Sequence, residues 1–243
     1  MQLIKLDATP STNQYLKQLV LKNLVDDYTV VTTENQTHGR GQMGASWISE
    51  TGKNLTFSML IFFENLNASH HVYLNCAVSL ALYDTLKDLS VPDLKVKWPN
   101  DIMSGNQKLC GILIENILQG NRINKSIIGI GLNVNQVNFG QLQNVSSLQL
   151  LLGIPMDLDK ILISLINSLK NRLKILSTPK INSLKKQYEQ VLFRKNKVST
   201  FASKTETLFT GIIKGLSDDG KLIVYTEDGV LQEFALKEVR LLY

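Results

Sequence analysis

The hydrophobic pattern of the chain changes near residue 193, and this change limits the fold to two dissimilar parts. Residues 157–176 repeat leucine and isoleucine at spacings of three and four, the pattern of an amphipathic helix, and a second helix is predicted at 180–192. The last 50 residues instead carry short apolar runs broken by the turn sequences SDDG (217–220) and EDG (227–229). We therefore expect a larger domain over 1–193 and a small β-barrel over 194–243.

The larger domain alternates strand-like and helix-like segments. Helices are expected at 12–24 and 70–89, the first with Ser11 or Thr12 as its N-cap. The expected strands lie at 4–6, 28–34, 54–63 and 94–98, followed by a hairpin formed by 108–118 and 123–135. This order is typical of a mixed β-sheet with packed helices, so the predicted fold class is α+β.

The composition is that of a globular protein of a reducing compartment. Hydrophobic residues make up 44% of the 243 positions, yet apolar runs such as MLIFF at 59–63 are far shorter than the roughly 18 residues of a membrane-spanning helix. The N-terminus lacks the apolar core of a signal peptide, and two cysteines, Cys76 and Cys110, exclude a disulfide framework. We expect a cytoplasmic protein with no membrane partner.

The net charge of +5 is unevenly distributed. Residues 156–204 hold 11 Lys and Arg residues against three acidic ones. A basic stretch of this kind can bind nucleic acid, but aromatic residues suited to base stacking do not alternate regularly with the charges. A solvated helix face is therefore the favoured interpretation, and no nucleic-acid partner is expected.

The predicted loop that is richest in glycine is QTHGRGQMGASW at 36–47. Gly39, Gly41 and Gly44 would let the backbone approach a ligand, and Arg40 adds a fixed positive charge, which together suit a phosphate group. The loop matches neither the Walker A sequence nor a strand–GxGxxG–helix unit. From spacing alone, a flexible surface loop remains an equal alternative.

Three further motifs combine polar residues with turns or glycines. KWPND at 97–101 predicts a turn that presents Asn100 and Asp101, KLCGI at 108–112 places Lys108 beside a glycine within a strand, and GIGLNVN at 129–135 ends a strand at two asparagines. Each has a purely structural alternative. His38, His70 and His71 lack the spacing of metal ligands, and no protein metal site is expected.

The order of these motifs is more specific than any one of them. STN at 11–13, QTHGRGQMG followed by Trp47, GKNL at 52–55, KWPND, KLCGILIE and GIGLNVN together resemble the biotin–protein ligases over nearly the whole chain. The resemblance implies a catalytic domain with the class II aminoacyl-tRNA synthetase-like fold of that family, and a C-terminal SH3-like β-barrel. Because STN stands at residue 11, we expect the monofunctional type, without an N-terminal DNA-binding domain.

The resemblance also implies an activity. Members of this family join biotin and ATP, with Mg²⁺, into biotinoyl-5′-AMP and pyrophosphate, and then transfer biotin to a lysine of the biotin carboxyl carrier domain of a biotin-dependent carboxylase. Both monomers and homodimers occur in the family, so a homodimer is one expected state.

Residue roles follow from the same resemblance. The implied biotin-binding residues are Ser11, Thr12, Asn13, Gln36, Gly39, Arg40, Gly41, Gln42, Lys108 and Gly111. The implied ATP-binding residues are Arg40, Trp47, Asn100, Lys108, Gly131 and Asn133. The implied catalytic residues are Arg40 and Lys108, which would hold carboxylate and phosphate, and Asp101, which would serve the incoming amine, assist the metal ion or fix the KWPND turn.

One departure from the family pattern lies in the loop at 36–47, which we expect to be mobile without ligand. Many members read GRGR here, whereas this chain has Gln42 in place of the second arginine. Two alternatives share parts of the pattern: a lipoate–protein ligase, and a non-catalytic biotin-binding relative. The loop and the spacing of Lys108 and Gly111 favour a biotin ligase.

Overall fold

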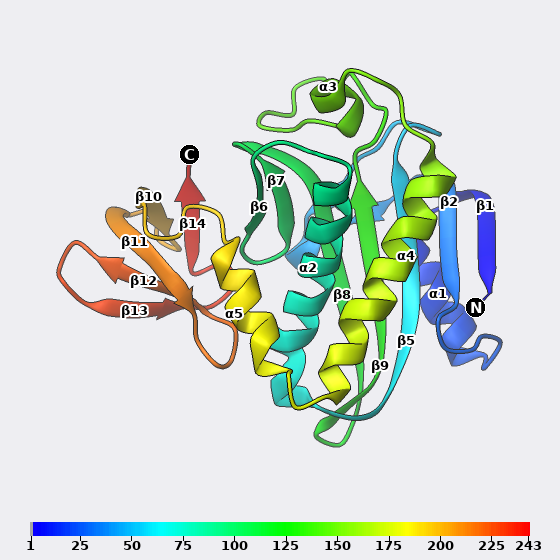
Figure 1. Cartoon of the computed structure of the whole chain (residues 1–243), viewed down its shortest axis with the longest axis horizontal. Helices are drawn as coiled ribbons and strands as arrows, with labels where there is room; N and C mark the ends of the chain where they lie inside the picture. The colour runs from blue at the N-terminus through cyan, green and yellow to red at the C-terminus, as the bar shows by residue number, and fades with distance from the viewer. Residues whose placement is uncertain (1) are drawn as a thin grey trace.

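The computed structural model describes residues 2–243, and its larger part is built on a seven-stranded mixed sheet (Figure 1). The strand order is β1-β2-β5-β9-β8-β7-β6; β1 and β2 are parallel and every other neighbouring pair is antiparallel. The strands are β1 (Leu3–Thr9), β2 (Val30–Gln36), β5 (Leu55–Asn67), β6 (Leu94–Lys97), β7 (Asp101–Ser104), β8 (Gln107–Gln119) and β9 (Arg122–Leu132). The mixed sheet predicted from the sequence is confirmed.

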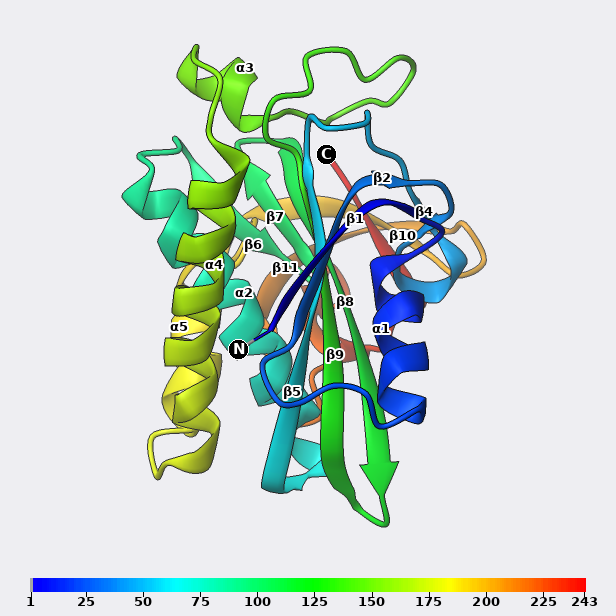
Figure 2. The same ribbon diagram turned by 90° about the vertical axis from the view of Figure 1, so that its right-hand side faces the viewer.

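Helices cover both faces of this sheet (Figure 2). α1 (Thr12–Leu21) lies on one face, where Leu16 and Val20 pack against Val31, Leu60 and Ile127 of the strands. The opposite face is covered by α2 (His71–Asp88), α4 (Leu158–Lys174) and α5 (Asn182–Gln190). Ser11 is the N-cap of α1, as predicted, and its hydroxyl accepts a hydrogen bond from the backbone N–H of Gln14.

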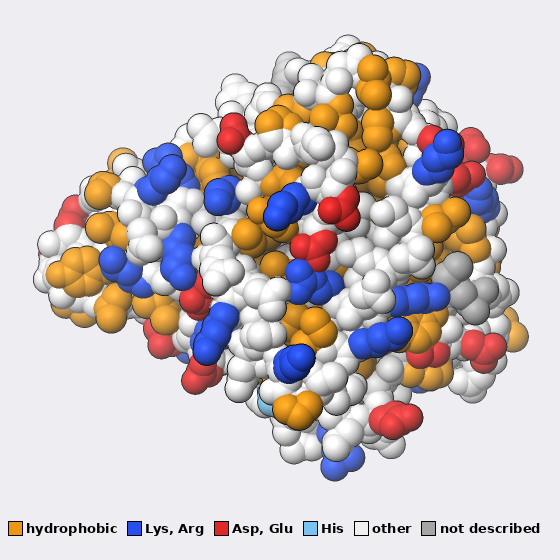
Figure 3. All heavy atoms as spheres, viewed as in Figure 1, with side chains coloured by type: hydrophobic (Ala, Val, Ile, Leu, Met, Phe, Trp, Pro, Cys, Tyr) orange, Lys and Arg blue, Asp and Glu red, His pale blue; other side chains and the backbone are white. Residues whose placement is uncertain are grey.

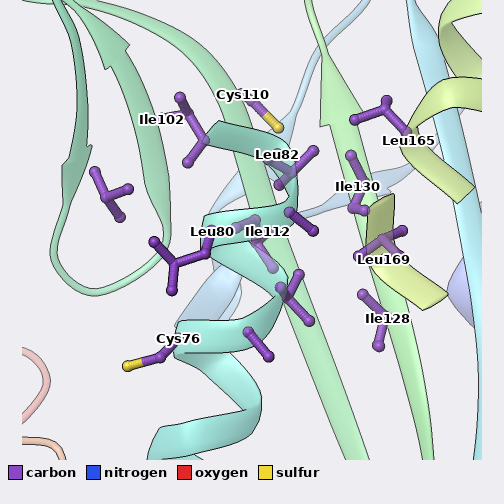
Figure 4. Close-up of a cluster of buried hydrophobic side chains, with 14 of the residues drawn as sticks. Cys76, Leu80, Leu82, Ile102, Cys110, Ile112, Ile128, Ile130, Leu165 and Leu169 are labelled. Carbon is purple, nitrogen blue, oxygen red and sulfur yellow. The ribbon is translucent and has the colours of Figure 1, made fainter. Parts of the chain in front are cut away.

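The main core lies between the sheet and the second helical layer (Figure 4). The apolar residues that recur along α4 at spacings of three and four face the sheet, as this spacing predicts. The apolar residues of α2 are buried on more than one side of the helix, because α2 is enclosed by α4, α5 and the sheet. Cys76 on α2 and Cys110 on β8 are both buried free thiols. The buried members of α4 are Ile161, Leu162, Leu165, Ile166, Leu169 and Leu173.

The C-terminal part is a five-stranded antiparallel sheet, as expected of an SH3-like domain. Its order is β13-β12-β11-β10-β14, and among residues 2–243 no pairing between β13 and β14 closes it into a complete barrel. Gly220 and Gly229 adopt positive φ in the turns predicted at SDDG and EDG. The strands are β10 (Val198–Ser203), β11 (Leu208–Leu216), β12 (Leu222–Thr226), β13 (Leu231–Phe234) and β14 (Val239–Leu242).

The two sheets share one hydrophobic core. Phe201, Ile213 and Leu222 of the C-terminal sheet belong to the same buried cluster as the residues of α2 and α5. The indole Nε1 of Trp98 also donates a hydrogen bond to the carbonyl oxygen of Gly220, at 3.0 Å. The domain division at residue 193 falls between α5 and β10 and stays a prediction.

Several short elements were not predicted. β7 follows the KWPND turn, and its four residues are too few to show an alternating pattern, yet it joins β6 to β8. α3 (Leu148–Leu152) has five residues, and the glycine-rich loop contains a small hairpin of β3 (Gly39–Arg40) and β4 (Ser46–Trp47). Within residues 2–243, no helix has both the length and the apolar character needed to cross a bilayer.

Candidate active site

A cavity of about 260 Å³ lies on the α1 face of the large sheet, between the start of α1 and the glycine-rich loop. The N-terminal turn of α1, the end of β2, the loop and the central strands β8 and β9 form its walls. It is slightly smaller than the roughly 300–1,000 Å³ typical of small-molecule sites. The lining residues are Ser11, Thr12, Asn13, Gln36, Arg40, Gly41, Gln42, Ala45, Ser46, Trp47, Thr56, Asn100, Asp101, Lys108, Gly111, Ile112, Leu113, Gly129, Ile130 and Gly131.

One end of the cavity is polar and uncharged. The side-chain oxygen of Gln36 accepts a hydrogen bond from the backbone N–H of Thr12 at 2.9 Å. The hydroxyl of Ser58 lies 2.7 Å from Thr12 Oγ1 and 2.5 Å from Asn13 Oδ1, and Asn13 Nδ2 donates to Glu115 at 2.8 Å. These bonds hold the neutral side chains in fixed orientations beside the cavity.

Ser58 and Glu115 support this end and were not predicted. Ser58 on β5 is fully buried, and Glu115 on β8 fixes the amide orientation of Asn13. Ser58 is a polar residue within the apolar run of β5, and this pattern is the signal that could have identified it. Glu115 is only partly buried and gives no comparable signal. Gly129 was also missed, although a Cβ there would lie 2.9 Å from Asn13 Cγ and would force the Asn13 side chain to shift.

The other end of the cavity is charged. Lys108 Nζ lies 2.7 Å from Asp101 Oδ1, and Arg40 lines the same cavity from the loop. The backbone of Lys108 is held on both sides, because its N–H donates to the carbonyl of Asn144 at 2.7 Å and its carbonyl accepts from Ser146 at 3.0 Å. Two cations and one carboxylate therefore face a single space, which favours an anionic ligand.

The indole ring of Trp47 lies across two glycines, Gly111 of β8 and Gly131 of β9. These two residues are paired with each other in the sheet, and we call them the glycine floor. A Cβ on Gly131 would lie 2.6 Å from Trp47 Cζ2, and one on Gly111 would lie 3.2 Å from Cζ3. The indole Nε1 is buried and has no hydrogen-bond partner among the described residues. Lys108 Nζ is 5.7 Å from the centre of the indole ring, a cation–π distance.

The structure gathers most of the residues implied by the resemblance. All of them line the cavity except Gly39 and Asn133. Gly39 lies next to it, where a Cβ would come within 2.6 Å of Gln36 Nε2. Asn133 is buried behind the wall, where its Nδ2 donates to the carbonyl of Ser146 at 3.0 Å and its Oδ1 has no partner among residues 2–243.

Asn100 lines the cavity, but its side chain also has a structural task. Its Nδ2 donates to the carbonyl of Ile112 at 2.7 Å, and its own carbonyl accepts from the Ile112 N–H at 2.9 Å. These two bonds join the KWPND turn to β8. They fix Asp101 close to Lys108, since Asp101 is the next residue in the chain.

The basic stretch 156–204 does not form a uniform positive surface. Arg172 pairs with Asp84 at 2.6 Å, Lys195 with Glu189 at 3.1 Å and Lys185 with Asp218 at 2.8 Å. Figure 3 shows acidic side chains among the basic ones on this side of the molecule. Within residues 2–243, no group of three or more His, Cys, Asp or Glu side chains is arranged to hold a metal ion.

Solved structures share this fold. Biotin protein ligase from Aquifex aeolicus in complex with biotin and ATP is 28% identical to this chain, with a TM-score of 0.80, over 99% of this chain and 98% of the other. A helix-covered mixed sheet, a C-terminal antiparallel sheet and a cavity with a neutral and a cationic end therefore define the class of protein. It is a ligase of the biotin–protein ligase type.

Sequence comparison gives the family. The profile of the Biotin/lipoate A/B protein ligase family matches residues 6–133, and that of the biotin protein ligase C-terminal domain matches 200–235. The chain belongs to the biotin/lipoate A/B protein ligase family, which confirms the resemblance seen in its motifs.

Two curated relatives show the level of similarity. The bifunctional ligase/repressor BirA of Escherichia coli is 27% identical over 243 residues, covering 97% of this chain and 73% of the relative. The biotin--[acetyl-CoA-carboxylase] ligase of Mycobacterium tuberculosis is 32% identical over 138 residues, or 56% of this chain and 50% of that one.

Proposed function

We propose that this enzyme attaches biotin to a lysine of a biotin carboxyl carrier domain, through biotinoyl-5′-AMP formed from biotin and MgATP. The observation that carries the proposal is the division of the cavity into a neutral hydrogen-bonding end and a cationic end. Biotin has the same division, with an uncharged ureido ring at one end and a carboxylate at the other.

The neutral end favours biotin over lipoate. The amide and hydroxyl groups of Thr12, Asn13 and Gln36 can exchange hydrogen bonds with a ureido group, which both donates and accepts. The dithiolane ring of lipoate offers only weak partners, so binding it would leave buried polar groups unpaired at a cost of about 1–3 kcal/mol each. This difference supports biotin as the substrate.

In the first step, a biotin carboxylate oxygen attacks the α-phosphorus of ATP, and the bond to the pyrophosphate leaving group breaks. Both reactants are anionic, so the step requires positive charge at the point where they meet. Arg40 and Lys108 supply it, and Lys108 is held ready by its ion pair with Asp101 and by the bonds to its backbone.

In the second step, the amine of the carrier lysine attacks the acyl carbon of the adenylate, and AMP leaves. The amine loses a proton, and Asp101 is the carboxylate that lines the cavity beside Lys108. We assign Asp101 as the group that orients this amine and accepts its proton.

The nucleotide extends beyond the cavity. A space of about 260 Å³ holds one small ligand, so ATP enters beside Trp47 as the loop moves. Trp47 Nε1 and Asn133 Oδ1 are buried atoms without partners among the described residues, and we assign them to the nucleotide as a donor and an acceptor. Mg²⁺ enters with the phosphates of ATP, since such ions are commonly held by substrate oxygens and one or two carboxylates.

The test is incubation of the purified enzyme with MgATP, a carrier domain and either biotin or lipoate. We expect a carrier mass shift with biotin that requires ATP, and none with lipoate. The Lys108→Ala variant serves as the control for adenylation. A shift with lipoate and none with biotin would contradict the assigned substrate, and pyrophosphate release without any carrier shift would contradict the assigned acceptor.

A further inference from the structure

The tip of the glycine-rich loop contacts the C-terminal sheet. Lys237, in the turn between β13 and β14, donates a hydrogen bond from Nζ to the carbonyl oxygen of Met43, at 2.9 Å. Met43 is the middle residue of the 3₁₀ turn Gln42–Gly44, which we call the loop tip. The contact spans 194 positions of sequence and joins the cavity wall to the smaller sheet.

The turn that presents Lys237 has an unusual backbone. Lys237 has φ of 65°, in the left-handed region where glycine is the residue without steric cost. The turn around it is closed by a bond from Glu238 N–H to the Ala235 carbonyl and by one from Ala235 N–H to the Glu238 carboxylate, at 3.2 and 2.7 Å. These two bonds hold the backbone of the turn, and with it the base of the Lys237 side chain, in a fixed position.

The hydrogen bonds of the loop tip do not by themselves attach it to the rest of the protein. Met43 also has positive φ, at 53°, and the bonds described for the tip, from Gly41 N–H to Ala45 and from Ala45 N–H to Gln42, lie within the loop itself. Apart from His38, Arg40 is the one basic residue of the sequence 36–47. A loop with a single guanidinium has little charge of its own with which to stay closed over an anionic ligand.

We propose that Lys237 is a positioning residue that fastens the loop tip to the C-terminal sheet and so keeps the loop closed over the adenylate. The proposal rests on the proposed function for the nature of the ligand. Lys237 brings a positive charge to the loop tip, where this chain has the neutral Gln42 in place of the arginine found in many members of the family. The C-terminal sheet thus takes part in retaining the intermediate without touching the reacting atoms.

The experiment compares Lys237→Ala, Lys237→Gly and Lys237→Arg with a matched control, Lys204→Ala. Lys204 is an exposed lysine that lines, together with Met43 and Lys237, a second cavity between the loop tip and the C-terminal sheet. One readout is the rate at which trypsin produces the fragment ending at Arg40 from ligand-free enzyme. The second is the escape of labelled biotinoyl-5′-AMP from preloaded enzyme without acceptor.

We expect Lys237→Ala and Lys237→Gly to raise both rates by up to about tenfold, the range for loss of one solvent-exposed hydrogen bond. Lys237→Arg keeps a donor and should stay near the wild type, as should Lys204→Ala. Lys237→Gly relieves the backbone strain, so its melting temperature should not fall, which separates loop opening from unfolding.

Unchanged cleavage and escape in both Lys237→Ala and Lys237→Gly would overturn the proposal, and so would equal increases in Lys204→Ala. If the wild type forms no adenylate, the proposed function fails instead. The trypsin readout would then still decide whether Lys237 holds the loop.

Discussion

Replacing Gly131 by alanine would test whether Trp47 closes the site by resting on the glycine floor. The new methyl group would lie 2.6 Å from Trp47 Cζ2 and 2.7 Å from Nε1, whereas carbon atoms in contact are about 3.5–4.0 Å apart. The backbone of Gly131 is not left-handed, so alanine brings no strain of its own. The ring must therefore move by about 1 Å or more, and the loop must open with it.

The magnitude follows from the area that the ring would lose. A buried aromatic side chain covers about 150–250 Å², and Trp47 is half-buried, so displacement exposes roughly 100 Å². At about 25 cal/mol per Å², this weakens loop closure by about 2–3 kcal/mol. We expect an increase in the KM for ATP and in adenylate escape of up to about 30- to 150-fold. Gly111→Ala, with 3.2 Å to the ring, should cost only a few-fold.

The assay is ATP- and biotin-dependent pyrophosphate release, with Trp47 fluorescence followed in a Trp98→Phe background, because the chain has two tryptophans. Adding Gly131→Ala to Trp47→Ala should cause almost no further loss, since the clash has been removed. Multiplicative losses in the double variant, or wild-type kinetics in Gly131→Ala, would refute the reasoning.

Three other predictions concern charge and protonation. Lys108→Ala should nearly abolish pyrophosphate release, because the reacting phosphate would lose about 1.5–3 kcal/mol of charge-assisted bonding before alignment losses. Normal release would remove Lys108 from the chemistry. Gln42→Arg should slow adenylate escape by around tenfold in the labelled-ligand assay, since a charged hydrogen bond is roughly twice as strong as a neutral one. Equal escape rates would show that the number of cations in the loop does not limit retention of the adenylate. Burial raises the pKa of the Cys76 thiol to about 12 and that of the Cys110 thiol further, so as the pH rises both thiols ionise in the unfolded chain before they ionise in the folded one. The free energy of unfolding, measured by denaturant titration, should therefore fall above pH 9 by up to about 1.4 kcal/mol per pH unit for each thiol. Cys76→Ala should reduce that slope.

The fold could be predicted where the sequence carries a long periodic signal. The helix at 157–176 and the hairpin of 108–118 with 123–135 appear as α4 and as β8 with β9, within a few residues at each end. β7 and α3 were missed because four or five residues are too few to show a period, and their structure depends on partners distant in sequence.

The site could be predicted in composition but not in detail. Ordered motifs identified Lys108, Arg40 and Gln36, which do line one cavity. The contribution of Ser58 depends on which face of β5 meets α1, and that register is fixed by tertiary packing. The contact of Lys237 with Met43 joins segments whose proximity no local pattern encodes.

The hydrophobic core that runs from the large sheet into the small one makes the two parts dependent on each other. Phe201 and Ile213 pack in the same cluster as the side chains of α2 and α5, so a change on the inner face of the small sheet alters the support beneath the catalytic half. The C-terminal sheet therefore cannot be replaced on its own by the corresponding sheet of a relative. A chimera would have to carry over the matching faces of α2 and α5 as well.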